Sequence, residues 1–492
     1  MRSNTLGLTA LIVSSALVMS SCASGDSSGA QESTQEEKPQ LATSGPEVLT
    51  DPDGSGAEVS ARLFESSDVV VVSTYELSDQ LQAAAVAKQQ GAPMLTRLTG
   101  NEAAVDAEIE RLGATQVIEV PGEDRALEDT EPVVAAARDS AVEAIAAQEG
   151  GEPSDLQMPP MLATPHTSLA AAATAAAAGA EIQVLSVPDP RETSESMRTV
   201  TEQDTLALGA QFGSSEEFGE RVELANNGEL PGGGGLLFPG RRMVALYGHP
   251  SGDSLGMMGE QPPAEAVDRL EGMIEDYQAL EEQPVLPAFE IIVTVASEFP
   301  GDDGDYSNEG DPEEFIGYID AITEAGGYAF LDLQPGQASF LDQAKRYEEL
   351  LKRPNVGLAL DPEWKIGPGE KPLQQVGHAE AAEINEVADW LAELTRENNL
   401  PQKGLILHQF QLQMLRDRDQ INTDHPELAF ILHADGHGSP NDKFDTWNAM
   451  RQGLSSDYFM AWKNFEDEDS PTFTPEETYN NVDPRPWFVS YQ

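Results

Sequence analysis

Cysteine and basic residues are scarce in this sequence. Cys22 is the only cysteine among 492 residues, so no disulfide can form within the chain. Lysine and arginine together number 28 against 86 aspartates and glutamates, which gives a formal charge of −58. A chain this acidic repels nucleic acid and anionic lipid surfaces, so we expect neither as a partner. The acidic residues are spread along the chain, which fits a general acidic bias; divalent cations or basic partners are the alternatives.

Long apolar runs are absent after the first twenty residues. The run from Leu6 to Met19 is mostly apolar, follows Arg2 and precedes two serines and Cys22. This layout is typical of a secretory signal peptide, which we place at residues 1–21. No other stretch reaches the roughly 18 consecutive apolar residues that a membrane-spanning helix needs. The mature protein is therefore expected not to span a membrane.

The small residues before Cys22 resemble the lipobox of bacterial lipoproteins, although Met19 stands where that motif usually has leucine. The resemblance implies cleavage before Cys22 and attachment of lipid to it. Such an anchor would hold the protein on the outer face of the bacterial cytoplasmic membrane. Residues 22–47 are rich in serine, glycine and acidic residues, so they bury too little surface to fold and are expected to form a disordered tether.

Two passages of the first half look alike. Residues 73–98 and 163–187 each run from a polar strand end through an alanine-rich helix to Gly-Ala and a second strand. Their regular order indicates an internal repeat. The first copy has the pattern of a small parallel α/β layer. Its strands are predicted near 68–73, 93–97 and 116–120, and its helices near 78–90 and 101–112.

The first copy resembles the type 2 cell wall-binding repeat of Gram-positive surface proteins. The matching residues are 62–74, 88–95 and 109–123, in the family's order of strand, helix, strand, helix, strand. The resemblance covers roughly residues 60–125 well and 155–212 loosely. It implies non-covalent binding to a cell wall polymer. A scaffold derived from such repeats is the alternative.

A run of four glycines within residues 228–240 separates two parts of the chain. We place a domain boundary there, between residues 48–240 and residues 241–492. After it, eight short apolar runs recur and indicate buried strands. They lie at 243–248, 288–296, 327–333, 356–361, 404–409, 428–434, 458–463 and 487–492.

Amphipathic helical patterns lie between most of these runs, for example over 312–326, 338–354 and 378–399. Apolar strands that alternate with such helices predict a parallel sheet buried on both faces. Eight units in about 250 residues have the size of a closed (β/α)8 barrel, and an open doubly wound sheet is the alternative. The predicted fold class is therefore α/β, with repeated parallel α/β layers followed by a barrel-like domain. Both folds place function at the carboxyl ends of the strands.

Polar residues gather at these predicted strand ends. Asp361 and Glu363 are two positions apart, so on extended backbone both side chains point the same way. Asp332 ends the preceding strand, and the clustering of three carboxyl groups raises the pKa of some of them. Capping the next helix or holding a loop is the structural alternative for each carboxylate, and packing is the alternative for each tryptophan. The candidates for contact with substrate are His249, Glu290, His408, Gln409, His433, Asp435 and Lys463, with Trp364 and Trp462 as rings that could stack on sugars.

The fourth predicted strand ends in Asp361-Pro362-Glu363-Trp364, which resembles the corresponding strand end of the family 18 glycoside hydrolases. The resemblance implies a glutamate that donates a proton to the glycosidic oxygen, and this role falls on Glu363. Gly357 and Ala359 replace the earlier aspartates of that family's motif, so only the acid role is carried over.

His433, Asp435 and His437 alternate along the chain near the neighbouring strand end at His408. Two imidazoles and a carboxylate on extended backbone suit zinc or manganese. Hydrogen bonding to substrate hydroxyls or to neighbouring carboxylates is the alternative, and no metal or other cofactor is predicted.

Three functional hypotheses follow. The first is a surface lipoprotein that binds the cell wall and whose barrel hydrolyses or remodels envelope glycans, with Glu363 as the acid and Asp361 or Asp332 as stabiliser or base. The second is a non-catalytic lipoprotein that binds cell wall polymers or glycans. The third is a metal-dependent hydrolase at the histidine and aspartate cluster. Residues 241–492 also resemble uncharacterised envelope lipoproteins of actinobacteria, which supports only the location.

Overall fold

The computed structural model describes residues 39–121, 140–151 and 156–492. The predicted signal peptide, the predicted lipid attachment site at Cys22 and most of the predicted tether lie outside these ranges. Among the described helices, none is long and apolar enough to cross a membrane.

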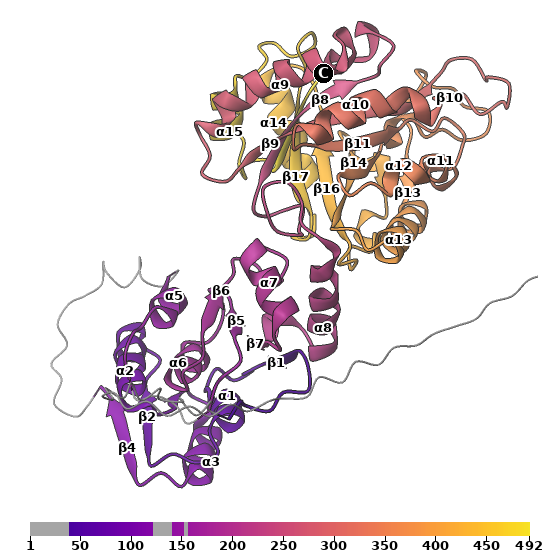
Figure 1. Cartoon of the computed structure of the whole chain (residues 1–492). Coiled ribbons are helices and arrows are strands. Elements are labelled where there is room, and N and C mark those ends of the chain that lie inside the picture. The colour runs from indigo at the N-terminus through magenta and orange to yellow at the C-terminus, as the bar shows by residue number, and fades with distance from the viewer. Residues whose placement is uncertain (1–38, 122–139, 152–155) are drawn as a thin grey trace, which may run out of the picture. The chain divides into compact units, whose positions relative to one another are not determined.

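Eight parallel strands form a closed barrel in the second half of the chain (Figure 1). Closure is direct, because β8 pairs with β9 on one side and with β18 on the other. The predicted barrel is therefore confirmed, and the open sheet is wrong. Its strands are β8 (Arg242–Gly248), β9 (Val285–Ala296), β11 (Tyr328–Leu333), β12 (Val356–Leu360), β14 (Lys403–His408), β16 (Leu428–Ala434), β17 (Phe459–Asn464) and β18 (Phe488–Tyr491).

Helices follow most of the strands and cover the outside of the barrel. The predicted helix over 338–354 divides at Tyr347 into two short helices, α11 and α12. A short strand, β10 (Ser307–Glu309), pairs antiparallel with β9, and β13 (Ala379–Glu380) pairs with β15 (Leu415–Arg416). The helices are α9 (Pro263–Gln278), α10 (Pro312–Glu324), α11 (Phe340–Arg346), α12 (Glu348–Leu351), α13 (Ala381–Glu397), α14 (Pro440–Arg451) and α15 (Pro475–Asn481).

The barrel strands bury both faces, as their continuous apolar sequences predict. Side chains such as Leu331 and Leu358 point outward and form the core shared with the helices. Side chains such as Phe330 and Ile406 point inward and fill the part of the barrel interior nearer the amino-terminal ends of the strands. Gly404 faces the same interior, where a Cβ atom would clash with the Phe330 ring. Glycine at this position therefore makes room for a bulky ring in the barrel core.

The glycine-rich segment 228–240 closes the amino-terminal end of the barrel. Leu230, Leu237 and Phe238 from this segment pack into the inward-facing core. The buried Arg241 donates hydrogen bonds to backbone carbonyls of Pro231, Gly233 and Leu236. Because this end is filled with hydrocarbon, open space in the barrel lies toward the carboxyl ends of its strands.

Two small parallel sheets precede the barrel. The strands and helices predicted between residues 68 and 120 are present, and the strands form a sheet in the order β3-β2-β4. The second sheet has the order β1-β7-β5-β6, with β1 at its edge. Thus β5 lies between β6 and β7, as β2 lies between β3 and β4. The strands are β1 (Glu47–Leu49), β2 (Val69–Ser73), β3 (Met94–Thr96), β4 (Gln116–Val120), β5 (Met161–Ala163), β6 (Ile182–Val184) and β7 (Leu206–Leu208).

Alanine-rich helices join the two sheets in one hydrophobic core. In α6, the residues from Ala170 to Ala177 are all buried, and Thr174 donates a hydrogen bond to the carbonyl of Met94 in β3. Small side chains let this helix approach both its neighbours closely. The helices here are α1 (Ala57–Leu63), α2 (Leu77–Gln90), α3 (Glu102–Leu112), α5 (Ala141–Ala146), α6 (Leu169–Ala177), α7 (Ser194–Glu202) and α8 (Ser215–Leu224).

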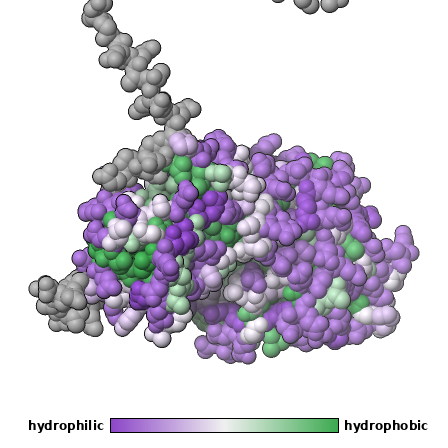
Figure 2. Space-filling model, turned by 90° about the horizontal axis from the view of Figure 1, so that it is seen from below, coloured by the Kyte–Doolittle hydropathy of each residue, from purple (hydrophilic) through white to green (hydrophobic). Residues whose placement is uncertain are grey.

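The surface agrees with the acidic composition. Figure 2 shows a face on which hydrophilic residues predominate, with smaller hydrophobic patches between them. Large apolar side chains that stay exposed among the described residues include Phe299, Leu373 and Leu412, which lie on loops that follow barrel strands.

Candidate active site

The barrel interior is polar near the carboxyl ends of the strands. There the inward-facing positions, which recur at every second residue, hold polar side chains beyond the apolar core. On β8, Met243 and Ala245 lie in the inward-facing core, and Tyr247 follows them at the same spacing. Phe330 on β11 is likewise followed by Asp332, and Ile406 on β14 by His408. Period-two alternation thus carries ionisable side chains into the barrel at the carboxyl ends of its strands.

The strand β12 ends at Leu360, one residue before the carboxyl pair. Residues 362–364 then form a 3₁₀ turn, and the Asp361 carboxylate accepts a hydrogen bond from the Glu363 backbone nitrogen at 3.3 Å. The expectation of extended backbone through Asp361 and Glu363 is therefore wrong, because Pro362 opens a turn. Asp361 does cap this turn, yet both carboxyl groups still line the same cavity.

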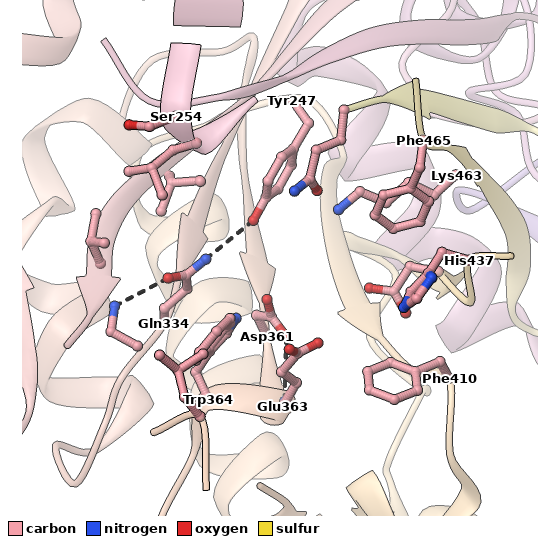
Figure 3. A pocket seen from close by; sticks show the side chains of 17 residues that line it. Tyr247, Ser254, Gln334, Asp361, Glu363, Trp364, Phe410, His437, Lys463 and Phe465 are labelled. Atoms are coloured by element: carbon pink, nitrogen blue, oxygen red, sulfur yellow. Dashed lines mark hydrogen bonds between the residues drawn. The ribbon is translucent and has the colours of Figure 1, made fainter. Parts of the chain in front are cut away.

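This cavity has a volume of about 390 Å³ and opens at the carboxyl ends of the barrel strands. In Figure 3, Asp361 and Glu363 lie on one side, and Lys463, His437 and Phe410 lie across from them. Rings of Trp364, Phe410 and Phe465 contribute apolar wall. The other lining residues are Tyr247, Ser254, Leu255, Ile292, Val295, Ala296, Gln334, Leu373, Asp435 and Gln492.

Two of the carboxyl groups that line the cavity, those of Asp361 and Glu363, have raised pKa values because they are buried. Burial raises the pKa of the Glu363 carboxyl to about 7, and the negative charge of Asp435 adds to the shift. Burial also raises the pKa of Asp361 well above its usual value, with the charge of Glu363 adding to the shift. Glu363 can therefore release a proton near neutral pH, which is what a general acid requires.

Asp435 has the opposite character. Burial acts to raise its pKa, but a hydrogen bond from His408 and the positive charges of His408 and Lys463 hold the pKa below its usual value. One carboxyl group that keeps its proton and one that has lost it therefore line the same cavity. Such divergent pairs are the pattern of acid and base assignments in enzymes.

His408 links Asp435 to Glu290 behind the cavity. Its Nδ1 atom lies 2.9 Å from Asp435 Oδ2, and its Nε2 atom lies 2.6 Å from Glu290 Oε1. Burial opposes protonation, but the charges of Glu290 and Asp435 hold the pKa of His408 well above its usual value. An imidazolium between two carboxylates orients both of them.

His433 stacks on His408 with ring centroids 4.7 Å apart and 20° between the ring planes. Its Nε2 atom lies 2.9 Å from Ser490 Oγ. Burial lowers the pKa of His433 well below its usual value, and the charge of His408 adds to this shift. His433 is therefore a neutral partner in the stack.

Tyr247 connects the cavity with the carboxylate of Asp332. Its hydroxyl donates a hydrogen bond to Asp332 Oδ2 at 2.9 Å and accepts one from the Gln334 amide at 3.3 Å. The Lys463 ammonium lies 3.7 Å from the centroid of the Tyr247 ring. Burial raises the pKa of Asp332 to about 7. Asp332 itself is fully buried and does not line the cavity.

The structure divides the predicted site residues into three groups. Asp361, Glu363, Trp364, Asp435, His437 and Lys463 line the cavity. Glu290, Asp332, His408 and His433 are fully buried directly behind that lining. His249, Gln409 and Trp462 do not reach the cavity.

Each of these last three has another environment. His249 is half-buried and bonds Ser251 at 2.8 Å, and burial lowers its pKa. Gln409 accepts a hydrogen bond from Arg418 at 2.6 Å and stabilises the following loop. Trp462 is buried against outer aromatic residues, with its ring stacked on Phe473 at 5.8 Å.

The alternative of a metal site at His408, His433, Asp435 and His437 is not supported by the positions of these side chains. His437 lies against Phe465 at 5.7 Å, and His433 is bonded to Ser490. In the described part of the chain, the ligand atoms of Glu290, Asp332 and His408 converge instead.

No protein-family model and no curated protein matches this chain. Its function must therefore be inferred from the geometry of the barrel interior.

Sequence reasoning missed several cavity residues. Tyr247 and Gln334 lie two residues beyond inward-facing positions on their strands, so alternation could have identified them. Phe410 and Phe465 lie in loops just after β14 and β17, where no periodic pattern indicates direction.

Proposed function

We propose that this protein is a bacterial envelope lipoprotein whose barrel hydrolyses glycosidic bonds in envelope glycans. The observation that carries the proposal is the presence of Glu363 and Asp435 in one cavity at the carboxyl ends of the barrel strands. Cavities at this end of (β/α)8 barrels are where such folds carry out their chemistry.

The chemistry requires one proton donor and one carboxylate. Glu363 donates its proton to the glycosidic oxygen while the bond between that oxygen and the anomeric carbon breaks. Asp435 supports attack on the anomeric carbon, either by accepting a proton from water or by bonding to the carbon itself. The separation of the two carboxyl groups around the bound sugar decides between inversion and retention. Asp435 thus takes the role predicted from the sequence for Asp361 or Asp332, because burial raises the pKa of Asp361 and Asp332 lies behind the lining.

The walls of the cavity suit a sugar. Aromatic rings pack on the apolar faces of sugar rings, and Trp364, Phe410 and Phe465 supply three such rings. Lys463, Gln334 and His437 offer hydrogen-bonding groups in the same space. A volume of about 390 Å³ lies within the range of small-molecule pockets and accommodates a short saccharide segment.

The first half of the chain would hold the barrel near its substrate. The lipobox-like sequence at Cys22 supports attachment to the outer face of the cytoplasmic membrane. The shared strand order of the two small sheets supports a repeat of the cell wall-binding kind. Tethering to both membrane and wall raises the effective concentration of envelope glycans at the barrel.

The test compares the full chain with two variants on purified peptidoglycan and on other polysaccharides extracted from bacterial envelopes. We expect wild type to release new reducing ends from at least one polymer. Glu363→Gln should lower this release at least 100-fold and retain glycan affinity. Glu349→Gln is the matched control, because Glu349 is an exposed acid on α12 paired with Lys352.

The alternative is a glycan-binding protein without turnover. If wild type binds a polymer but releases no reducing ends from any, the binding hypothesis replaces hydrolysis. If both glutamate variants match wild-type turnover, Glu363 is not the acid.

A further inference from the structure

Three potential metal ligands meet inside the barrel behind the cavity lining. Glu290 on β9, Asp332 on β11 and His408 on β14 are each 0 % exposed. One ligand atom from each, two carboxylate oxygens and an imidazole nitrogen, lies within 4.8 Å of the others. His408 Nε2 is 2.6 Å from Glu290 Oε1 and 4.0 Å from Asp332 Oδ1. The 2.6 Å contact is a hydrogen-bond distance, so a shared ion would displace the proton between these two atoms and move them slightly apart.

Two oxygens in this group lack the hydrogen bonds that buried carboxylates normally have. Among the described residues, no donor contacts Glu290 Oε2 or Asp332 Oδ1, and both atoms are inaccessible to solvent. A buried, unsatisfied acceptor costs about 1–3 kcal/mol, and more when it is charged. The charge of His408 offsets part of this cost, but within the described residues its Nε2 atom bonds only Glu290 Oε1, so the two other oxygens remain open to a bound cation.

The surrounding groups orient the three ligands as an outer shell does in metal sites. Asp435 bonds to Nδ1 of His408, which leaves Nε2 directed at the two carboxylates. Tyr247 donates a hydrogen bond to Oδ2 of Asp332, and Oδ1 of Asp332 has no hydrogen-bond partner among the described residues. A carboxylate on the far nitrogen of a ligating histidine is the usual arrangement in such sites.

We propose that Glu290, Asp332 and His408 bind one divalent metal ion, of the Mn²⁺ or Zn²⁺ class, directly behind the lining of the cavity. Two carboxylates and one imidazole suit these ions, whereas Ca²⁺ prefers six to eight oxygens. Asp435 and Tyr247 line the cavity and also touch two of the ligands, so water from the cavity could complete the coordination.

The competing occupant is a proton. In that case His408 is an imidazolium that donates from Nε2 to Glu290, and the cluster is a hydrogen-bonded network without metal. A proton and a metal ion require the same lone pair of Nε2, so the two states are exclusive and can be separated by experiment.

The test uses the full chain, stripped with a chelator, loaded with Mn²⁺ or Zn²⁺ and desalted. We expect one ion per chain by elemental analysis of the desalted protein. In a separate melt of the stripped protein, with the free ion at about a hundred times its Kd, we expect Tm to rise by about 4 °C or more. Ca²⁺ at the same concentration should give neither result. Asp332→Asn and Glu290→Gln should each lose the bound ion.

A matched control guards against loose binding to this acidic chain. Asp303, Asp305 and Glu309 form a second acidic group, in which Asp303 is exposed and the other two are half-buried, and Asp305→Asn should retain the ion. The proposal is overturned if stripped wild type binds no more Mn²⁺ or Zn²⁺ than Ca²⁺, a result that does not depend on the variants folding. It is also overturned if Asp305→Asn loses the ion while folded Asp332→Asn keeps it.

Discussion

The barrel and the two small sheets treat buried acids differently. In the sheets, Asp51 accepts hydrogen bonds from the Gly56 nitrogen and from Ser168, and Glu108 forms an ion pair with Arg111 at 2.7 Å. In the barrel, one oxygen each of Glu290, Asp332 and Asp435 has no hydrogen-bond partner within the described ranges, and the same holds for one oxygen of Glu427, which does not line the cavity.

The difference teaches where to look for function. A satisfied buried carboxylate stabilises a loop or a helix, as those of the sheets do. A group of unsatisfied carboxylates destabilises the fold, and such costs persist at sites that act on a ligand. Buried unsatisfied side-chain atoms also occur in the described part of the sheet region, at Ser60 and Gln148, but neither residue ionises.

The largest effect that sharpens this contrast is on turnover. Asp435→Asn removes the carboxylate and alters its bond to His408, so we expect turnover to fall by about 10²–10⁴-fold. Glu108→Gln in the sheet region should leave turnover unchanged. Both are measured as reducing ends released per chain. Equal turnover in the two variants would remove the functional distinction between the regions.

A packing change should affect the sheet region alone. Ala172 in α6 is 0 % exposed, so Ala172→Leu forces a larger side chain into a closely packed core. We expect the free energy of unfolding to fall by about 1–3 kcal/mol in urea titrations. The barrel should keep its turnover per folded molecule. No loss of stability would mean that α6 is less tightly packed than the structure indicates.

A carboxyl group that resists ionisation should also cost stability. The pKa of Glu363 is raised from 4.5 to about 7 on folding, so the folded state binds more protons than the unfolded state between these values. The contribution of Glu363 to stability is therefore fully present below pH 4.5 and is lost as the pH rises through 7. Glu363→Gln should be about 1–3 kcal/mol more stable than wild type at pH 8, and this gain should vanish near pH 4. The comparison is made by urea unfolding at both pH values, and a gain that is the same at both would contradict it.

The smallest effects should be equal in the two regions. Ser214 caps α8 in the sheet region and Thr474 caps α15 in the barrel, each through a reciprocal capping box. Replacing either with alanine should cost about 1 kcal/mol of unfolding free energy and leave turnover unchanged. Thermal melts of the two variants check this, and a turnover loss in Thr474→Ala would extend the site to the outer helices.

The sequence predicted the barrel well because its signal is periodic. Each apolar run is a strand, since parallel strands buried on both faces need continuous hydrocarbon. Side chains alternate between the inside and the outside of the barrel along each strand, and this alternation would have excluded one predicted site residue. Ala461 and Lys463 face inward, so Trp462 between them had to face the helices.

The rest depended on backbone that leaves the regular pattern. Pro362 turns the chain after β12, so the directions of Asp361 and Glu363 could not follow from strand geometry. Asp435 is assigned as the partner of Glu363 because a hydrogen bond with His408 helps to hold its pKa below the usual value. His408 and Asp435 are 27 positions apart in the chain. Pairings of this kind need coordinates, because pattern and spacing do not record them.

The most direct test of the account is a carbon-13 NMR titration of the Glu363 carboxyl, isolated by subtracting the spectrum of Glu363→Gln from that of the labelled wild type. We predict that this carboxyl titrates with an apparent pKa near 7, as a proton donor enclosed in the barrel cavity must. A titration midpoint below 5 would show an ordinary solvated carboxylate and would contradict its role as the acid.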